Sequence, residues 1–170
     1  MKVWRKRNEY PYFHSSKKGR KNIILAITDN KILLYELNNW ANKSHDFLAF
    51  MKKLDNIIKD ENLQDYLIVM DNFSIHLTTE LKNFYKEKKM KILTIVPYSS
   101  MFNGIEFFFN YIKQKIYKKV FNSFSKMIPF IEKIINDEFI DEILAKIYIK
   151  TLNIYKEYIF NNKSINLNSI

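Results

Sequence analysis

The sequence predicts an α/β domain, in which a mixed sheet of an antiparallel hairpin and parallel strands is flanked by helices and followed by a helical C-terminal extension. Three observations lead to this fold class. Two β-rich runs lie on either side of an Asp-Asn pair, two further apolar runs of strand length alternate with helical patterns, and the chain after residue 126 has helical character. Strands that alternate with helices are typical of sheets covered by helical layers.

The hairpin is expected near the start of the chain. Residues 22–28 (NIILAIT) and 31–37 (KILLYEL) are apolar and rich in residues that favour strands. Asp29 and Asn30, which lie between them, suit a tight turn. The two runs are therefore predicted to pair as antiparallel strands.

A helix and two strands of a different kind follow the hairpin. Ser44 can cap a helix that carries apolar residues at helical spacing and ends near Asn62. Residues 66–70 (YLIVM) and 91–96 (KILTIV) are continuous apolar runs, which predict strands buried on both faces. The remaining helices are expected from residue 78 or 79 to 89, from about 104 to 121 and, as one or two helices, from 126 to about 160.

The net charge of +10 is concentrated in the first part of the chain. Against Glu9 alone, residues 1–21 hold the basic residues Lys2, Arg5, Lys6, Arg7, Lys17, Lys18, Arg20 and Lys21. From Lys126 onward the basic and acidic side chains balance. This distribution is expected of a surface that binds phosphates. A solvated lysine-rich surface explains the charge as well, so charge alone does not decide between them.

The composition also excludes some classes of protein. The absence of Cys rules out a disulfide framework and a thiolate zinc site, and it favours a reducing, intracellular compartment. No apolar run approaches the roughly 18 residues of a membrane span, and no apolar segment of a signal peptide follows the basic start. We therefore expect a soluble, unprocessed intracellular protein with no membrane partner, located in the nucleus if the host is eukaryotic.

Two acidic residues stand where an α/β sheet gathers its catalytic groups, beyond the carboxyl ends of parallel strands. Asp71 directly follows YLIVM, and Glu106 lies in the first turn of the helix that comes after KILTIV. Each residue also has a purely structural explanation. Asp71 and Asn72 can simply turn the chain, and a Glu in the first turn interacts favourably with the helix dipole.

The predicted helix around Glu106 has two distinct faces. Its polar face carries Glu106, Asn110, Lys113 and Tyr117, and its apolar face carries Ile105, Phe108, Ile112, Ile116 and Val120. One carboxylate among cationic and polar neighbours fits a metal ligand on a phosphate-binding surface. A solvated helix face fits the pattern nearly as well.

Together, the two stretches resemble a known family. YLIVMDNFSIH followed by TIVPYSSMFNGIEFFFNYIK resembles the hallmark of the Tc/mariner-type DDE transposases and their bacterial insertion-sequence relatives. In that family a strand ends in Asp-Asn with a His four residues after the Asn, and a second strand leads into Pro-Tyr-Ser and then Leu-Asn-Pro-Ile-Glu on a helix. Thirty-four residues separate Asp71 from Glu106, which is the family's spacing, and the resemblance covers roughly residues 22–119.

The resemblance implies a ribonuclease-H-like fold and a metal-dependent DNA endonuclease and strand transferase. In an intact family site, three carboxylates hold two divalent ions, Mg²⁺ or Mn²⁺, which activate the attacking oxygen and stabilise the leaving oxygen of a DNA phosphodiester. By motif position, Asp71 is the second catalytic and metal-binding carboxylate and Glu106 is the third. The other matching residues, which are expected to shape the site, are Asn72, His76, Pro97, Tyr98, Ser99 and Asn103.

DNA is the partner that the resemblance implies. Phosphate contacts are expected from the basic residues of segment 1–21 and from Lys113, Lys115, Lys118 and Lys119. A homodimer is compatible with the resemblance, and no small-molecule cofactor is implied. His76 is expected to contact DNA, to order its loop or to serve as a structural hydrogen-bonding residue.

The sequence departs from the family pattern in three respects. No Asp precedes Asp29, which we interpret as a turn residue, so the first catalytic carboxylate is expected to be missing and the chain to be truncated at its amino end. Gly104 replaces the family's Pro and Phe102 its Leu, and both changes are expected to loosen the helix start. The family's helix-turn-helix DNA-binding region is also absent, so sequence-specific recognition should be lost.

Three segments follow from these patterns. Residues 1–21 form a basic N-terminal segment, the remnant of the region after the missing strand; residues 22–125 form the ribonuclease-H-like DDE transposase core; and residues 126–170 form the helical extension with a frayed tail. The leading hypothesis is a transposase catalytic domain whose enzymatic activity depends on the first Asp. Its alternatives are a non-catalytic nucleic-acid-binding remnant, which the missing Asp favours, and an unrelated α/β interaction protein.

Overall fold

A computed structural model describes residues 22–38, 43–97, 99–119, 121 and 124–160. In chain order they form β1 (Asn22–Ile27), β2 (Ile32–Asn38), α1 (Ser44–Asp60), β3 (Ile68–Met70), the short 3₁₀ helix η1 (Ser74–Leu77), α2 (Thr79–Glu87), β4 (Ile92–Thr94), the 3₁₀ helix η2 (Ser100–Phe102), α3 (Gly104–Tyr117), α4 (Phe124–Ile135), α5 (Ile140–Tyr155) and the π-helical turn η3 (Lys156–Phe160). The predicted α/β fold class is confirmed. Segment 1–21 and the tail from residue 161 lie outside the described residues.

The described strands form two separate two-stranded sheets. β1 and β2 are the predicted antiparallel hairpin, closed by a turn in which the Thr28 N–H donates to the Lys31 carbonyl oxygen at 2.8 Å. β3 and β4 are parallel, with Met70 opposite Thr94. The predicted antiparallel and parallel pairs are both present, and each pair keeps an edge that no described strand occupies.

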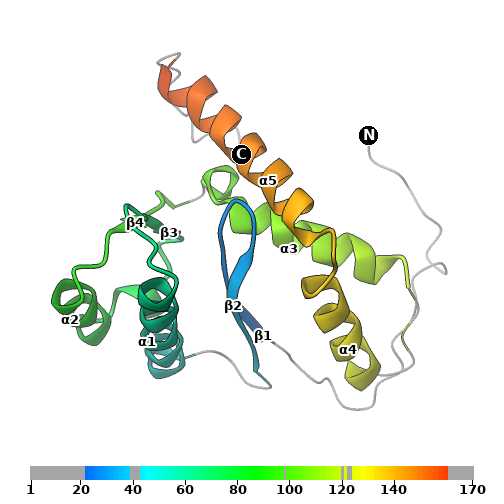
Figure 1. Cartoon of the computed structure of the whole chain (residues 1–170), viewed down its shortest axis with the longest axis horizontal. Helices are drawn as coiled ribbons and strands as arrows, with labels where there is room; N and C mark the ends of the chain where they lie inside the picture. Colours follow the sequence, from blue (N-terminus) through cyan, green and yellow to red (C-terminus); the bar gives the residue numbers. More distant parts are fainter. Residues whose placement is uncertain (1–21, 39–42, 98, 120, 122–123, 161–170) are drawn as a thin grey trace.

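The hairpin lies between two hydrophobic clusters because successive side chains of a strand point to opposite faces. Ile24 of β1 belongs to a first cluster with Phe47, Leu48, Phe50, Met51, Leu54, Ile58, Met70, Leu81, Phe84, Tyr85 and Met90. The next residue, Leu25, belongs to a second cluster with Phe108, Ile112, Ile131, Ile134, Ile135, Ile140 and Leu144. The hairpin therefore has α1 on one side and α3, α4 and α5 on the other (Figure 1).

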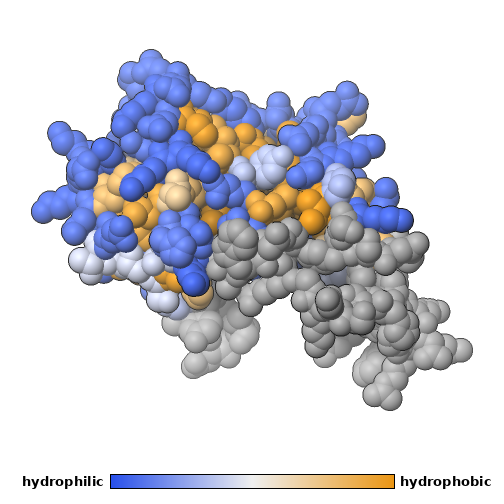
Figure 2. Space-filling model, turned by 90° about the horizontal axis from the view of Figure 1, so that it is seen from below, coloured by the Kyte–Doolittle hydropathy of each residue, from blue (hydrophilic) through white to orange (hydrophobic). Residues whose placement is uncertain are grey.

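The parallel strands are less buried than the sequence predicts. Met70 packs in the first cluster, but Leu67, Val69 and Leu93 are 54%, 37% and 42% exposed. The prediction of strands buried on both faces is therefore wrong for the described structure. The second cluster contains no residue of β3 or β4, because α3, α4 and α5 pack against the hairpin instead. Hydrophobic patches also lie between hydrophilic residues on the face shown in Figure 2.

The helix starts follow local hydrogen bonding. α2 begins where the sequence predicts, and Thr78 caps it, since its hydroxyl accepts from the Leu81 N–H at 3.5 Å. Ser44 is not the cap of α1; instead, the Asp46 carboxylate accepts from the Lys43 N–H at 2.9 Å. None of the described helices is long and apolar enough to cross a membrane.

The start of α3 packs closely against α5. A Cβ atom added to Gly104 would lie 3.1 Å from the Thr151 hydroxyl oxygen and 3.6 Å from Ile147 Cγ2. The Thr151 hydroxyl is held in place because it donates to the Ile147 carbonyl oxygen at 2.9 Å. Instead of the loosened helix start expected from the sequence, Gly104 allows a close contact between two helices.

The close contact between Gly104 and Thr151 leads to a prediction for the stability of the protein. Gly104→Ala is expected to lower the free energy of unfolding by about 1 kcal/mol, because crowding against Thr151 outweighs the better helix propensity of Ala. In a Thr151→Ala background the same substitution should become neutral or stabilising, since the crowded oxygen is gone. Chemical denaturation of the four proteins in a double-mutant cycle measures the coupling. If Gly104→Ala lowers the free energy of unfolding equally in both backgrounds, the contact with Thr151 is not the cause of the destabilisation.

Candidate active site

The two predicted motifs leave the same edge of the parallel sheet. β3 and β4 run side by side, and the Ile95 N–H, just after β4, donates to the Met70 carbonyl oxygen at 2.9 Å. Asp71 follows Met70 directly, and the segment that leads to Glu106 begins at Ile95. The carboxyl ends of parallel strands are where α/β sheets place their ligand-binding groups.

Asp71 is a solvent-exposed carboxylate that lies next to His76. Its side chain is 58% exposed, and its Oδ1 lies 2.8 Å from Nδ1 of His76 in η1. The His76 ring is stacked on Phe47 of α1, with centroids 4.1 Å apart and an interplanar angle of 29°. The predicted role of His76 in ordering its loop therefore has a structural basis: the ring joins Asp71 to the buried face of α1.

The backbone at His76 is fixed from the opposite side. The Tyr85 hydroxyl of α2 donates to the His76 carbonyl oxygen at 3.2 Å. Burial raises the pKa of Tyr85 to about 12, because the negative phenolate is poorly solvated there. The hydroxyl consequently remains a proton donor at neutral pH.

Glu106 is half-buried in the first turn of α3. Its N–H donates to the carbonyl oxygen of Asn103, a buried residue at the N-cap position whose side chain makes no capping hydrogen bond. Ser99, earlier in the same segment, is also buried, and its hydroxyl oxygen has no hydrogen-bond partner within the described residues. That Asn103 and Ser99 shape the site stays a prediction.

The segment before α3 is held by the C-terminal helix. The Tyr155 hydroxyl of α5 donates to the Phe102 carbonyl oxygen at 3.0 Å, and the two rings lie 5.0 Å apart. Burial also raises the pKa of Tyr155, so that this donor too keeps its proton at neutral pH. α5 thus fixes the chain two residues before Gly104.

The described residues do not form a complete metal site. No group of three or more His, Cys, Asp or Glu side chains in the described part of the chain is arranged to hold a metal ion. Asn72 and Pro97 are exposed, and Tyr98 lies outside the described residues. Asp29 is exposed in the turn between β1 and β2, as the sequence predicts. That Asp71 and Glu106 act as a pair remains a prediction.

The predicted DNA-binding lysines of α3 and of the residues after it are accessible. Lys113, Lys115, Lys118 and Lys119 are all exposed, as is Tyr117 on the same polar face. The buried face of α3 carries Phe108 and Ile112, which confirms the predicted division of the helix; Val120 lies outside the described residues. The basic residues of segment 1–21 also lie outside them.

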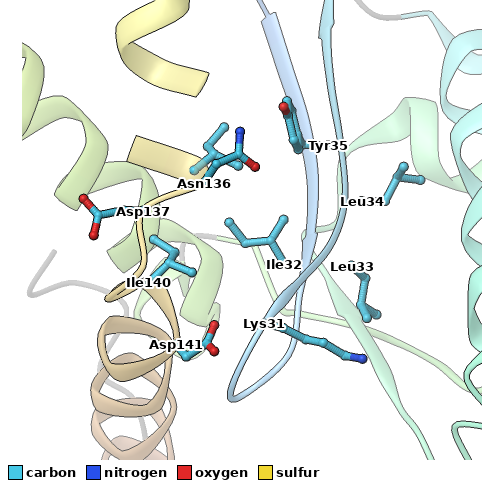
Figure 3. A pocket seen from close by; sticks show the side chains of 10 residues that line it. Lys31, Ile32, Leu33, Leu34, Tyr35, Asn136, Asp137, Ile140 and Asp141 are labelled. Carbon is cyan, nitrogen blue, oxygen red and sulfur yellow. The ribbon is translucent and has the colours of Figure 1, made fainter. Parts of the chain in front are cut away.

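A pocket of about 470 Å³ lies elsewhere, beside β2 and the connection between α4 and α5 (Figure 3). Its lining consists of Lys31, Ile32, Leu33, Leu34, Tyr35, Ile135, Asn136, Asp137, Ile140 and Asp141. None of these residues belongs to either motif, so this pocket is not the candidate active site.

Three residues that support the site have no sequence signal for that role. Phe47 is one of the apolar residues at helical spacing in α1, and Tyr85 and Tyr155 belong to no motif. Each contacts a residue at least nine positions away, beyond the reach of turn and helix patterns in a single sequence.

Comparisons with known proteins agree with the fold and the motifs. The sequence profile of the DDE superfamily endonucleases matches residues 2–128. No curated protein is significantly similar in sequence. The Mos1 transposase catalytic domain with raltegravir and Mg is similar in structure, with a TM-score of 0.72 and 11% identity over 86% of this chain and 82% of that one.

Two other Mos1 structures are similar to the same extent. The crystal structure of the Mos1 mariner transposase catalytic domain has a TM-score of 0.67 and 11% identity, over 87% of this chain and 82% of that one. The Mos1 mariner paired-end complex with Mn has a TM-score of 0.71 and 12% identity over 97% of this chain, which spans about half (52%) of the Mos1 chain in that complex. At this identity the likeness establishes the fold, and the profile match establishes the family. The chain belongs to the DDE superfamily of endonucleases and has the fold of a mariner transposase catalytic domain.

Proposed function

We propose that this chain is the catalytic portion of a DDE transposase, which cleaves and joins DNA with the help of divalent metal ions inside the cell. The observation that carries the proposal is the parallel pairing of β3 with β4, which starts both motif segments at one edge of the sheet. Asp71 follows one strand, and the segment that enters α3 with Glu106 follows the other. Family membership excludes the alternative of an unrelated interaction protein.

The donor atoms at this edge suit a hard divalent cation. Carboxylate oxygens are the ligands that Mg²⁺ and Mn²⁺ prefer, and Mos1 structures have been determined with Mg and with Mn. We propose Asp71 and Glu106 as metal ligands, with Asn72, His76, Pro97, Tyr98, Ser99 and Asn103 around them. When bound, such ions activate the attacking oxygen and stabilise the leaving one. The described residues supply only part of the ligand set.

The alternative is a non-catalytic protein that only binds nucleic acid. It is favoured by the absence of a three-ligand cluster among the described residues. Metal-dependent nicking of a DNA duplex supports the catalytic proposal. Salt-sensitive DNA binding without nicking, even in a protein completed with a third carboxylate, supports the alternative.

DNA itself is the proposed partner, as in the Mos1 paired-end complex with a left transposon end. We propose that the protein acts as a homodimer, which sedimentation with and without DNA can test. DNA phosphates would be bound by the exposed lysines of α3, by the two lysines that follow it and by the basic residues of segment 1–21. DNA binding should therefore be weak and indifferent to the DNA sequence.

Binding through phosphate contacts predicts how the affinity for DNA depends on salt. Lys113→Gln combined with Lys118→Gln should flatten the dependence of log affinity on log salt by about one for each phosphate that is no longer neutralised. Lys52→Gln with Lys82→Gln removes the same charge from exposed positions on α1 and α2 and should change the slope less. Fluorescence anisotropy with two unrelated duplexes measures both effects. Equal slopes for the two double variants, or a preference for one duplex, would contradict this surface.

A further inference from the structure

We propose that Phe47 is a positioning residue for the Asp71 carboxylate and that it acts through the ring of His76. The inference rests on the proposed function, in which Asp71 binds a divalent cation. It assigns a role at the site to a residue of α1 that lies outside both sequence motifs.

Asp71 cannot be oriented by packing, because more than half of its side chain is exposed. In the described part of the chain, its carboxylate makes a polar contact with His76, at 2.8 Å between Oδ1 and Nδ1; the same Nδ1 lies farther, at 3.5 Å, from the Asp71 backbone carbonyl oxygen. If Nδ1–H donates to Oδ1, that oxygen is fixed and Oδ2 faces away from this contact. Such an arrangement presents one oxygen to a cation in a defined direction.

His76 needs support of its own to orient Asp71. It lies in a single 3₁₀ turn, η1, where its N–H donates to the Phe73 carbonyl oxygen at 2.9 Å. The Phe73 ring is 55% exposed and meets the His76 ring only edge-on, at 5.9 Å. Phe47, by contrast, is 7% exposed and lies flat against the imidazole at 4.1 Å. The rigid surface beneath His76 is therefore Phe47.

The Tyr85 hydrogen bond leaves the ring orientation open. It fixes the His76 carbonyl oxygen, whereas rotation of the side chain is limited by the ring contacts. An imidazole that turns away from Phe47 would lose its alignment with Asp71. Hydrogen-bonding partners of ligating carboxylates typically change metal affinity by about 10- to 100-fold when they are removed.

The alternative is that Phe47 is only a core residue. Phe50 provides the matched control, because it lies one turn further along α1, is also buried and stacks on Phe47 at 6.3 Å. The contact with His76 is made by the Phe47 ring. Phe47→Leu and Phe50→Leu both remove a buried ring, and a purely structural role would give them similar effects.

The experiment measures Mn²⁺ affinity of the 170-residue chain by electron paramagnetic resonance for the wild type, Phe47→Leu, Phe50→Leu, His76→Ala and Phe47→Leu/His76→Ala. We expect affinity to fall about 10- to 100-fold in His76→Ala and about three- to tenfold in Phe47→Leu, with little change in Phe50→Leu. In the His76→Ala background, Phe47→Leu should cause no further loss. In the metal-free proteins, ¹⁵N NMR of the His76 ring should show the Nδ1 hydrogen bond weakened by Phe47→Leu and kept in Phe50→Leu.

Equal effects of Phe47→Leu and Phe50→Leu would overturn the inference, as would additive losses in the double variant. These results leave the proposed function standing if Asp71→Asn still abolishes Mn²⁺ binding. If Asp71→Asn binds Mn²⁺ like the wild type, both the metal-site proposal and the inference fail. Because none of the η1 residues is fully buried, His76→Ala should fold even if Phe47→Leu does not, and normal Mn²⁺ affinity in His76→Ala would also overturn the inference.

Discussion

A polypeptide of these 170 residues is expected neither to nick nor to join DNA measurably in Mg²⁺ or Mn²⁺. Two ions on either side of one phosphate need a bridging carboxylate and at least one further ligand each. Asp71 and Glu106 alone should hold at most one loosely bound ion. Because phosphoryl transfer depends mainly on positioning and charge stabilisation, the loss should exceed about 10²- to 10³-fold. A supercoiled plasmid-nicking assay measures it.

Adding an upstream strand that carries an Asp, taken from a related transposase, is expected to restore Mn²⁺-dependent nicking. The hairpin and the parallel pair each keep an edge without a described neighbour, so an added strand has a place to pair. The control is the same extended protein with that Asp replaced by Asn, which should be inactive.

Two outcomes would contradict this expectation. Robust nicking by the 170 residues alone, abolished by Asp71→Ala, would mean that another carboxylate completes the site, and Asp29 would be tested first. Failure of an extended protein that folds and binds Mn²⁺ would favour the non-catalytic alternative. The start of α3 at Gly104 would then be examined, since it sets the position of Glu106.

The second large effect concerns metal binding. Asp71→Asn and Glu106→Gln are each expected to lower Mn²⁺ affinity by more than about tenfold, because each removes a charged ligand and not merely a residue that supports one. The fold should be unaffected, since Asp71 is largely exposed and, if the two carboxylates converge as proposed, removing one of them relieves repulsion in the metal-free protein. Calorimetric titration and thermal unfolding measure the two quantities separately.

Asp65→Asn is the matched control for the metal experiment. Asp65 lies before β3, at the opposite end of the strand from Asp71, and its side chain is 96% exposed. Its backbone has a φ of 54°, a conformation that Asn tolerates, so the substitution changes charge without strain. Unchanged affinity in Asp65→Asn and lowered affinity in both site variants would localise the ion. Normal Mn²⁺ affinity in Asp71→Asn and Glu106→Gln would count against the metal site.

Much of the architecture could be predicted from the sequence because its signals are local. The two β-rich apolar runs around Asp29 and Asn30 predicted the hairpin, and residues 78 and 79 marked the start of α2. The helical spacing after Gly104 separated the buried from the polar face of α3. The ordered motifs around Asp71 and Glu106, at their fixed separation, identified the family. Turn chemistry and side-chain periodicity act within a few residues, so they can be read from the chain itself.

The tertiary structure decided what depends on contacts between distant elements. An apolar strand is buried on both faces only if helices cover both, and here α3, α4 and α5 cover the hairpin and leave Val69 and Leu93 exposed. The support of His76 by Phe47 and of Phe102 by Tyr155 joins residues 29 and 53 positions apart. The apolar spacing of α1 identified Phe47 as buried but could not say which ring it would meet, because that depends on how α1, η1 and α2 pack together.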